Sequence, residues 1–337
     1  MNALTYSRFG GPELLQHTQQ PAPRVRAHHL LIRVRAVSVN PIDGKIRRGE
    51  LKLLSGAHFP KSPGSDFAGV VEEVGAGVEG FSVGDRVFGF PGSMREGTLA
   101  GLITVAAKSV ARIPSGLDDV GAAAVSTVGL AALQALRDVA RVAPGERILV
   151  NGATGGVGLM LIQFARSRGA HVTAVTSAAG LATARQFGAQ RGHDYRTGPL
   201  SMLGERFDVV FDLSTKLPFA DARDLLAPRG RHVAFEPSPL LLMSSALLGP
   251  FRRQKQLVLV TKPSARDLTE LAGMLQAREL LPPPTEVFEL SDARSAFERS
   301  ERGGVIGKVV IRTAPAPTSP CWSRARRASR PTSSRTG

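Results

Sequence analysis

A glycine-rich turn between an apolar strand and an apolar helix is the feature that most constrains how this chain folds. The strand signal covers Arg147–Asn151, and the turn that follows carries Gly152, Gly155 and Gly158 at a three-residue spacing. Glycine has no Cβ, so such a turn lets an anionic group approach the backbone N–H groups and the positive end of the next helix. The turn predicts a cradle for a phosphate group, with a G-x-x-G-x-x-G spacing that is less common than G-x-G-x-x-G.

The residues after the turn extend this prediction to a dinucleotide site. Apolar residues recur at helical spacing up to Ala165, Gly169 ends the helix, and His171–Thr176 reads as a second strand. A strand, a helix and a strand in this order are typical of dinucleotide-binding sheets. Further strand signals at 209–211, 232–235 and 257–260 alternate with helical segments. The expected fold class is therefore α/β, with a Rossmann-type doubly wound parallel sheet.

The end of the second strand indicates which dinucleotide is bound. An NAD site normally offers a carboxylate there to the ribose hydroxyls, but the chain reads Thr176-Ser177 and has no acid between Gly158 and Asp194. Nothing there repels a 2′-phosphate, and the Ser177 hydroxyl can donate a hydrogen bond to it. NADPH is therefore the expected cofactor, although no Arg or Lys directly follows Ser177.

The net charge of +15 raises the question of a nucleic-acid partner. Residues 313–337 contain five arginines and no acid, which leaves +10 for the rest of the chain. That segment is rich in Pro, Ser and Ala without hydrophobic periodicity, so we expect a disordered basic tail. Aromatic residues make up only 5% of the chain and are not interleaved with basic ones. We expect no specific nucleic-acid partner, and the positive charge is either an ordinary solvated surface or steers an anionic cofactor.

Cysteine and histidine usage argues against a metal site. The single cysteine, Cys321, excludes an intramolecular disulfide and a thiolate metal cluster within one chain, and the seven histidines do not follow a metal-ligand spacing. The start of the chain does not resemble a signal peptide, and the longest apolar run, 239–249, is about half the length that crosses a bilayer. The prediction is a cytoplasmic protein with no metal and no transmembrane segment.

Near residue 117 the sequence changes from strand-like patterns to an Ala-rich, helix-forming pattern, which suggests two domains. Runs such as Leu30–Val39 and Phe67–Val74 predict a strand-rich domain over residues 1–120, and an Ala-rich helix then runs through 117–136. The nucleotide-binding domain is expected over 121–284, with a helix at 219–226 and another that opens with a capping box at Ser264 and runs to about Leu280. A last strand at 304–311 is expected to return to the first domain, so that 285–312 completes it.

The order of several motifs resembles the medium-chain dehydrogenase/reductases, and more narrowly their zinc-free quinone oxidoreductase branch. The matching segments, which together cover residues 1–312, are Tyr6–Leu15, Val39–Asp43, Pro63–Val71, Gly84–Gly89, Gly129–Leu136 and the glycine turn. The resemblance implies that the strand-rich domain is GroES-like. Relatives that oxidise alcohols hold a catalytic zinc with a cysteine and a histidine. Asn40 lies near the place of that cysteine and Ser65 stands for the histidine, so the resemblance implies zinc-independent chemistry.

The same resemblance implies the reaction: hydride transfer from NADPH to the β-carbon of an α,β-unsaturated carbonyl or to a quinone. Negative charge then develops on the carbonyl oxygen, which requires a hydrogen-bond donor or a cation, and a proton must also be delivered. Asn40 is the first candidate for the donor. Lys45 aligns where several relatives have tyrosine and is a candidate to polarise the carbonyl or deliver the proton. Asp43 is included with these two, although it is better suited to fixing the turn after Pro41.

The chain departs from the pattern of its relatives near the cofactor. The threonine that often faces the nicotinamide is Ala131 here, and Ser126 replaces a proline. Tyr195-Arg196 remains in the position that helps to bind the adenosine phosphate. The candidate cofactor-binding residues are Gly152, Thr154, Gly155, Gly156, Val157, Gly158, Thr176, Ser177, Tyr195 and Arg196.

Two alternatives to a general enone or quinone reductase stay open: a pathway-specific enoyl reductase in biosynthesis, and a non-catalytic NADPH-binding or regulatory protein. The apolar insert 240–248 and the basic residues after it resemble the chloroplast-envelope and reticulon-interacting subgroup. That resemblance implies a small hydrophobic enone or quinone substrate or a lipid-surface encounter, while a helix packed at a sheet edge or a dimer interface explains the insert equally well. The family also implies a homodimer joined through the nucleotide-binding domains.

Overall fold

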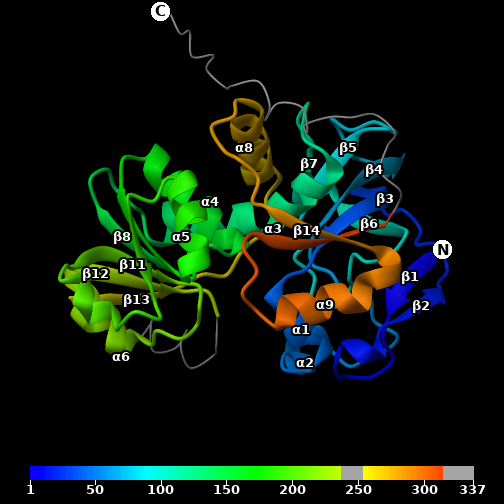
Figure 1. The fold of residues 1–337 in the computed structure, drawn as a ribbon. Helices are drawn as coiled ribbons and strands as arrows, with labels where there is room; N and C mark the ends of the chain where they lie inside the picture. Colours follow the sequence, from blue (N-terminus) through cyan, green and yellow to red (C-terminus); the bar gives the residue numbers. More distant parts are fainter. Residues whose placement is uncertain (237–252, 314–337) are drawn as a thin grey trace, which may run out of the picture.

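Two β-sheets, with one long helix between them, organise the chain in the computed structural model, which describes residues 1–236 and 253–313 (Figure 1). The first sheet lies on the right of Figure 1 and the second on the left. The apolar insert 240–248 and the tail from residue 314 onward, for which the sequence suggested a lipid-facing or interface segment and disorder, lie outside the described residues.

The first sheet has seven strands, five of which come from the N-terminal third of the chain. Its strand order is β14-β15-β3-β4-β5-β7, with β6 paired to β3, and only the β14–β15 pair is parallel. A separate hairpin of β1 and β2 lies beside it. The hairpin consists of β1 (Asn2–Thr5) and β2 (Gln16–Gln19). The strands of the first sheet are β3 (His29–Ser38), β4 (Phe67–Val74), β5 (Arg86–Gly89), β6 (Leu102–Ala106), β7 (Val110–Arg112), β14 (Thr285–Glu289) and β15 (Lys308–Arg312).

The second sheet has six parallel strands in the order β10-β9-β8-β11-β12-β13. These are β8 (Arg147–Asn151), β9 (His171–Thr176), β10 (Arg191–Asp194), β11 (Phe207–Asp212), β12 (Leu226–Ala234) and β13 (Lys255–Val258). From the central strand β8 the chain first builds outward through β9 and β10, and then restarts on the other side at β11. This is the doubly wound order, in which ligands bind at the carboxyl ends of the strands where the direction of winding reverses. The fold class expected from the sequence is confirmed.

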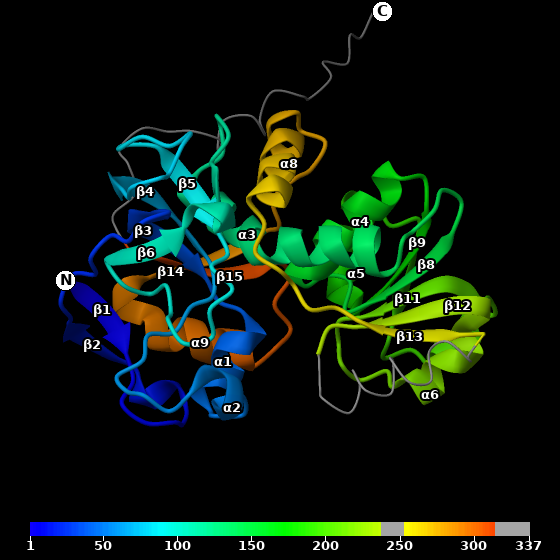
Figure 2. The ribbon, with the colours of Figure 1, turned by 180° about the vertical axis from the view of Figure 1, so that it is seen from behind.

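The helices divide between the two sheets. Those near the first sheet are α1 (Pro41–Arg47), α2 (Lys52–Ser55) and α9 (Ala293–Glu301), and those near the second are α4 (Gly156–Ser167), α5 (Ala178–Gln186) and α6 (Phe219–Ala222). Seen from behind, α8 (Ala265–Gln276) stands above the junction of the two halves (Figure 2).

Helix α3 (Asp119–Gln134) lies between the two sheets and continues as a π-helical turn, Ala135–Val139. Its N-terminus is capped by Asp118, whose side chain accepts a hydrogen bond from Gly121 N at 2.7 Å. The helix packs on β3, β4 and β15 of the first sheet and on α4 of the second half. Among the described residues, Asp119–Val139 is also the one helical stretch long and apolar enough to span a membrane, and 89% of its apolar window is buried inside the protein. Its apolar character is therefore explained by its position in the core.

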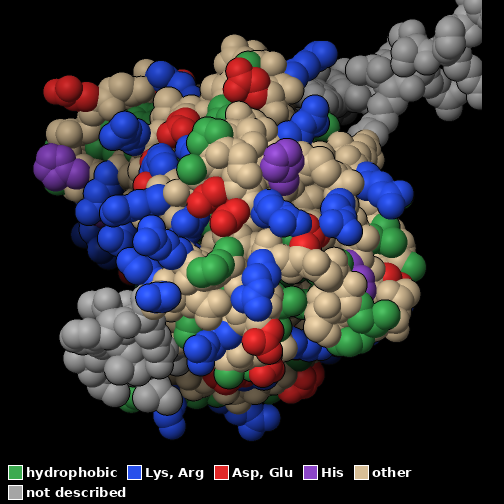
Figure 3. All heavy atoms as spheres, turned by 90° about the vertical axis from the view of Figure 1, so that its left-hand side faces the viewer, with side chains coloured by type: hydrophobic (Ala, Val, Ile, Leu, Met, Phe, Trp, Pro, Cys, Tyr) green, Lys and Arg blue, Asp and Glu red, His purple; other side chains and the backbone are tan. Residues whose placement is uncertain are grey.

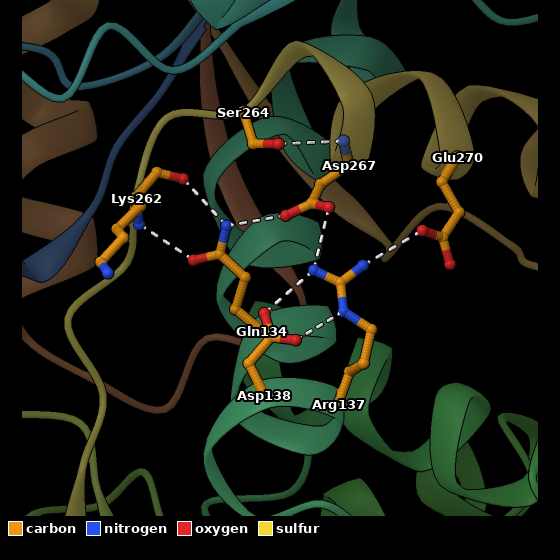
Figure 4. Close-up of polar contacts among 7 residues, drawn as sticks. All are labelled: Gln134, Arg137, Asp138, Lys262, Ser264, Asp267 and Glu270. Atoms are coloured by element: carbon orange, nitrogen blue, oxygen red, sulfur yellow. Dashed lines mark hydrogen bonds and ion pairs between the residues drawn. The ribbon is translucent and has the colours of Figure 1, made fainter.

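A polar cluster fixes helix α8 and the segment before it to the end of α3 (Figure 4). The Gln134 side chain donates to Lys262 O and accepts from Lys262 N, both at 2.9 Å. Gln134 Nε2 also donates to Asp267 at 2.9 Å, and Arg137 donates to the other oxygen of Asp267 at 2.9 Å. The chain that leaves the second sheet after β13 is thereby attached to the helix that both halves share.

The structure confirms most of the element predictions and corrects three of them. The helix expected over 219–226 is only Phe219–Ala222 followed by a 3-10 turn, because Leu226 already begins β12. The strand expected at 257–260 lies at Lys255–Val258, and α8 ends at Gln276 rather than near Leu280. Ser264 caps α8 by accepting from Asp267 N at 3.1 Å, but the Asp267 carboxylate faces Gln134 and Arg137, so only one arm of the predicted capping box has a hydrogen bond in the structure.

The last two strands return to the first sheet, as the sequence suggested. β15 pairs with β3 in antiparallel register, with Val310 opposite Ser38, and β14 pairs with β15. The boundaries proposed at residues 120 and 284 stay predictions, since α3 and α8 both pack against elements of the first sheet.

Candidate active site

The glycine turn lies where the sequence placed it, between β8 and α4 at the reversal point of the second sheet. Gly152 has φ of +87°, a conformation that L side chains rarely adopt. A Cβ at Gly158 would lie 2.5 Å from Ala153 O, so the backbone leaves no room for a larger residue. Helix α4 begins at a glycine N-cap, Gly155, without a side-chain cap or an acidic residue in its first turn. The glycine turn and the N-terminus of α4, which has no side-chain cap, fit an anionic phosphate group.

The residues predicted for the adenosine end of the cofactor lie together at the carboxyl ends of β9 and β10. The Thr154 and Thr176 hydroxyls are hydrogen-bonded to each other at 2.5 Å, which fixes the turn to the end of β9. Ser177 is the N-cap of α5, and its side chain makes no capping hydrogen bond. Tyr195 N donates to Thr176 O at 3.1 Å, and the Arg196 guanidinium lies over the Tyr195 ring at 5.3 Å from its centroid. Ser177 and Arg196 thus each follow the carboxyl end of one of two neighbouring strands, where the sequence predicts the 2′-phosphate site.

A buried polar cluster occupies the junction between β3 and α1 in the first half of the protein. Asn40 precedes α1, and its backbone N–H donates to the Asp43 carboxylate at 2.8 Å. The other oxygen of Asp43 accepts a hydrogen bond from the Ser65 hydroxyl. Asn40 and Asp43 are each less than 5% exposed. Asp43 thus fixes the start of α1, the role that the sequence favoured for it; a catalytic role for it stays a prediction.

Asp66 and Lys308 form the charged centre of this cluster. The Asp66 carboxylate accepts from Ser38 N at 2.7 Å, from the Ser38 hydroxyl at 2.6 Å and from Asn40 Nδ2 at 2.9 Å. The Lys308 ammonium donates to Asn40 Oδ1 at 2.7 Å and to Val39 O at 2.8 Å. Asn40 Nδ2 also donates to Ser38 O at 3.1 Å. Both N–H groups of the Asn40 side-chain amide therefore already donate to atoms of the protein. To polarise a substrate carbonyl, Asn40 would have to give up one of these hydrogen bonds and donate to the substrate instead.

Burial dominates the protonation of this cluster. It raises the pKa of Asp43 from 3.8 to about 7; hydrogen bonds from Ser65 and Asn40 oppose the rise, while the Asp66 charge adds to it. Burial likewise raises the pKa of Asp66 and lowers that of Lys308, and each of these two charges partly offsets the shift of the other. The cluster therefore holds a carboxyl group that titrates near neutral pH beside a buried cation.

We expect this raised pKa to make stability depend on pH through Asp43. The folded protein keeps the Asp43 proton after the unfolded chain has lost it, so this contribution favours folding fully below about pH 3.8 and is lost as the pH rises through about 7. Relative to the non-titrating variant Asp43→Asn, the unfolding free energy of the wild type should fall by on the order of 4 kcal/mol across this window. Urea unfolding from pH 4 to 8 measures the difference, and parallel curves for the two proteins would contradict the prediction.

Lys45, the third catalytic candidate, reaches from α1 to the nucleotide-binding half. Its ammonium forms an ion pair with Glu236, which follows β12, and the two side chains are 28% and 48% exposed. Lys45 is thus solvent-accessible and crosses from one half of the protein to the other, whereas Asn40 and Asp43 are buried. Its catalytic role stays a prediction.

The structure brings the predicted residues together in two groups, one around the glycine turn and one around α1. Sequence reasoning missed Ser38, Asp66 and Lys308, which complete the second group. Two signals pointed to them: Ser65-Asp66 directly before an apolar strand, and a lysine inside the apolar run Val305–Ile311. Charged residues in buried strands are rare unless they are paired.

The residues at the two zinc-ligand places have other partners. Asn40 is bonded to Lys308 and Asp66, and Ser65 to Asp43. Across residues 1–236 and 253–313, no three His, Cys, Asp or Glu side chains are grouped so that they could hold a metal ion.

Comparison with known proteins places both halves of the chain. Residues 26–115 match the alcohol dehydrogenase GroES-like domain, and residues 187–311 match the zinc-binding dehydrogenase family. The chain is 31% identical to the chloroplast envelope quinone oxidoreductase homolog of Arabidopsis thaliana over 322 residues, which covers 92% of this chain and 98% of the relative. It is also 31% identical to 2-methylene-furan-3-one reductase of Solanum lycopersicum over 326 residues, which covers 94% of this chain and 80% of the relative.

A solved structure has the same architecture. The quinone oxidoreductase from Coxiella burnetii superimposes with a TM-score of 0.84 and is 28% identical; the match covers 93% of this chain and 99% of that one. The strand-rich half, the doubly wound half and their order in the chain are therefore shared with that structure.

Proposed function

Because this chain belongs to the quinone oxidoreductase branch of the medium-chain dehydrogenase/reductase family, we propose that it reduces an α,β-unsaturated carbonyl compound or a quinone with NADPH, without a zinc ion. The observation that carries the proposal is the glycine turn before α4, which has no side-chain cap and which the Lys308 side chain links to the buried cluster around Asn40. NADPH, when bound, supplies the hydride. The protein's own residues bind and orient the reactants and stabilise the charge that develops on the carbonyl oxygen.

Several features support NADPH over NADH. Ser177 has a hydroxyl that its helix does not use, and Arg196 lies two residues after the end of β10, the strand beside β9. No acid follows the glycine turn before Asp194. One oxygen of the Asp194 carboxylate accepts a hydrogen bond from the backbone N–H of Arg196 at 3.0 Å, so Asp194 has a partner within its own turn. Figure 3 shows Lys and Arg side chains gathered on one part of the face formed by the nucleotide-binding half. This face points away from the first sheet, whereas the glycine turn contacts Gly307 beside that sheet, so the preference for NADPH rests on Ser177 and Arg196.

The experiment is a turnover assay in which the purified protein oxidises NADPH or NADH in the presence of quinones and medium-chain enones. We expect turnover with NADPH and a kcat/KM at least about tenfold lower with NADH, which corresponds to one charge-assisted contact of the 2′-phosphate. Cofactor binding without turnover on any of these substrates would overturn the general reductase and favour a pathway-specific enoyl reductase or a non-catalytic NADPH-binding protein.

For Lys45 we propose the role of the cation that polarises the substrate carbonyl, because it is the accessible candidate of the three. The variant Lys45→Met is expected to lower kcat about 10–100-fold, the usual effect of removing one charge-stabilising or proton-donating group. Glu236→Gln is the matched control, since it breaks the same ion pair but leaves the lysine in place. If only the ion pair matters, both variants lose activity equally, and the assignment of Lys45 is wrong.

A cytoplasmic location and a homodimer are also part of the proposal. Strand β13 is the last strand in the order of the second sheet, and an edge strand offers unpaired backbone groups to a second copy. A dimer mass in sedimentation at micromolar concentration supports this part of the proposal, and a monomer mass overturns it.

A further inference from the structure

Lys308, at the start of β15, contacts both groups of site residues. Its side chain is only 5% exposed. The ammonium donates to Val39 O and Asn40 Oδ1, the last groups before α1. The stem of the same side chain lies against the glycine turn, since a Cβ at Gly156 would come within 2.6 Å of Lys308 Cδ and 2.9 Å of its Cγ.

The backbone beside Lys308 is attached to the same turn. Gly307 N donates to Thr154 O at 2.8 Å, and Gly307 forms an isolated parallel bridge with Gly155. Gly307 has φ of +91°, and a Cβ there would lie 2.0 Å from Pro284 O, so this close approach requires glycine. Residues 307 and 308 therefore connect the cofactor turn to the β3–α1 junction.

The chemistry of the ammonium fixes how the junction is oriented. A lysine ammonium only donates, so the Asn40 amide must present Oδ1 to it, and this turns Nδ2 toward the Asp66 carboxylate. Lys308 also provides the positive charge beside the two buried carboxylates, Asp43 and Asp66. A neutral residue of the same length would keep the contact with Gly156 but would leave Asn40 Oδ1 and both carboxylates without their cation.

We propose that Lys308 is a positioning residue for the reaction: it holds the start of α1, which carries Lys45, at a fixed place relative to the turn that binds the cofactor. The expected effect of Lys308 on turnover rests on the proposed reductase function, whereas its expected effect on the position of α1 does not. A small displacement of reacting groups from their productive geometry costs up to about 100-fold in rate.

The test compares Lys308→Met, Lys308→Arg and the control Lys61→Met. Lys61 is a second buried lysine, 4% exposed, whose ammonium donates to Ser55 O at 2.5 Å and not to Val39 or Asn40. For Lys308→Met we expect faster amide hydrogen exchange confined to peptides covering 39–47, a kcat about 10–100-fold lower, and an NADPH dissociation constant within about threefold of the wild type. Lys308→Arg, which keeps a donor cation, should recover most of the kcat and the protection of 39–47.

The readouts separate this inference from the proposed function. Exchange of 39–47 and NADPH binding, measured by the fluorescence of the bound nicotinamide, do not require turnover. Unchanged exchange in Lys308→Met, an equal effect on 39–47 in Lys61→Met, or NADPH affinity falling in parallel with kcat would each overturn the positioning role. A wild type that binds NADPH but reduces no enone or quinone overturns the proposed function, while faster exchange of 39–47 in Lys308→Met alone still supports the inference.

Discussion

Replacement of Gly158 by alanine is expected to weaken NADPH binding at least about 100-fold. The added Cβ would lie 2.5 Å from Ala153 O and 2.7 Å from Gly152 O, and both of these are backbone atoms that cannot move aside without reshaping the turn. A reshaped turn misplaces the N–H groups at the start of α4. Each hydrogen bond to a charged group is worth about 1.5–3 kcal/mol, so the loss of one or two accounts for this decrease. Fluorescence titration with NADPH measures it.

The control for this variant is Gly273→Ala in α8. A Cβ at Gly273 meets no atom within 4 Å, and alanine is the better helix former, so this variant should bind NADPH normally and gain about 0.5–1 kcal/mol in unfolding free energy. Normal NADPH affinity in Gly158→Ala would show that the cofactor does not use this turn. The dissociation constant must be measured on folded protein, which far-UV circular dichroism of both variants verifies.

The second large effect is expected from Asp66→Ala, which should lower the unfolding free energy by about 3–5 kcal/mol. Asp66 is fully buried and accepts three hydrogen bonds, two from Ser38 and one from Asn40. Its removal leaves these donors unpaired and leaves the Lys308 cation with fewer buried counter-charges. Guanidinium unfolding at neutral pH measures the change.

Glu72→Ala provides the matched comparison for this stability measurement. Glu72 pairs with Arg33 on the surface, where the two side chains are 33% and 51% exposed, and such pairs contribute about 1 kcal/mol or less. Equal losses in the two variants would mean that the buried cluster contributes no more than a surface ion pair. Such a result would also weaken the case for Lys308 as an organising cation.

The elements around the predicted site that sequence reasoning placed correctly are those formed by neighbouring residues, while the binding roles of those residues stay a prediction. The glycine turn, the strand before it and the helix after it lie within 20 residues of each other, and the constraint on each glycine is local. The adenosine-side group was predictable because β8, β9 and β10 are consecutive, so their carboxyl ends meet at one edge of the sheet.

The rest depends on contacts between residues far apart in the chain, which no local pattern encodes. Lys308 and Asn40 are 268 positions apart, and Lys45 and Glu236 are 191 apart. From the sequence alone, a lysine within an apolar strand suggests an exposed position at a sheet edge. Only the topology shows that β15 lies against β3 and that Gly307, beside Lys308, contacts the glycine turn. Similarly, the helix expected to continue to Leu226 ends early because the pairing of β12 with β11 determines the structure of that residue.

The position of β3 in the first sheet has a consequence for how the protein is made. β3 is complete after the first 38 residues of this sequence, yet its partner β15 spans 308–312 and is synthesised much later. Until then residues 36–38 of β3 lack their β15 partner, although β6 already pairs with residues 29–33; long-range strand pairing of this kind forms slowly and exposes nascent chains to aggregation. A chain truncated before residue 308 would leave residues 36–38 of β3 permanently without that partner. Cellular yield should therefore depend on chaperones that hold the nascent N-terminal sheet until β15 is synthesised.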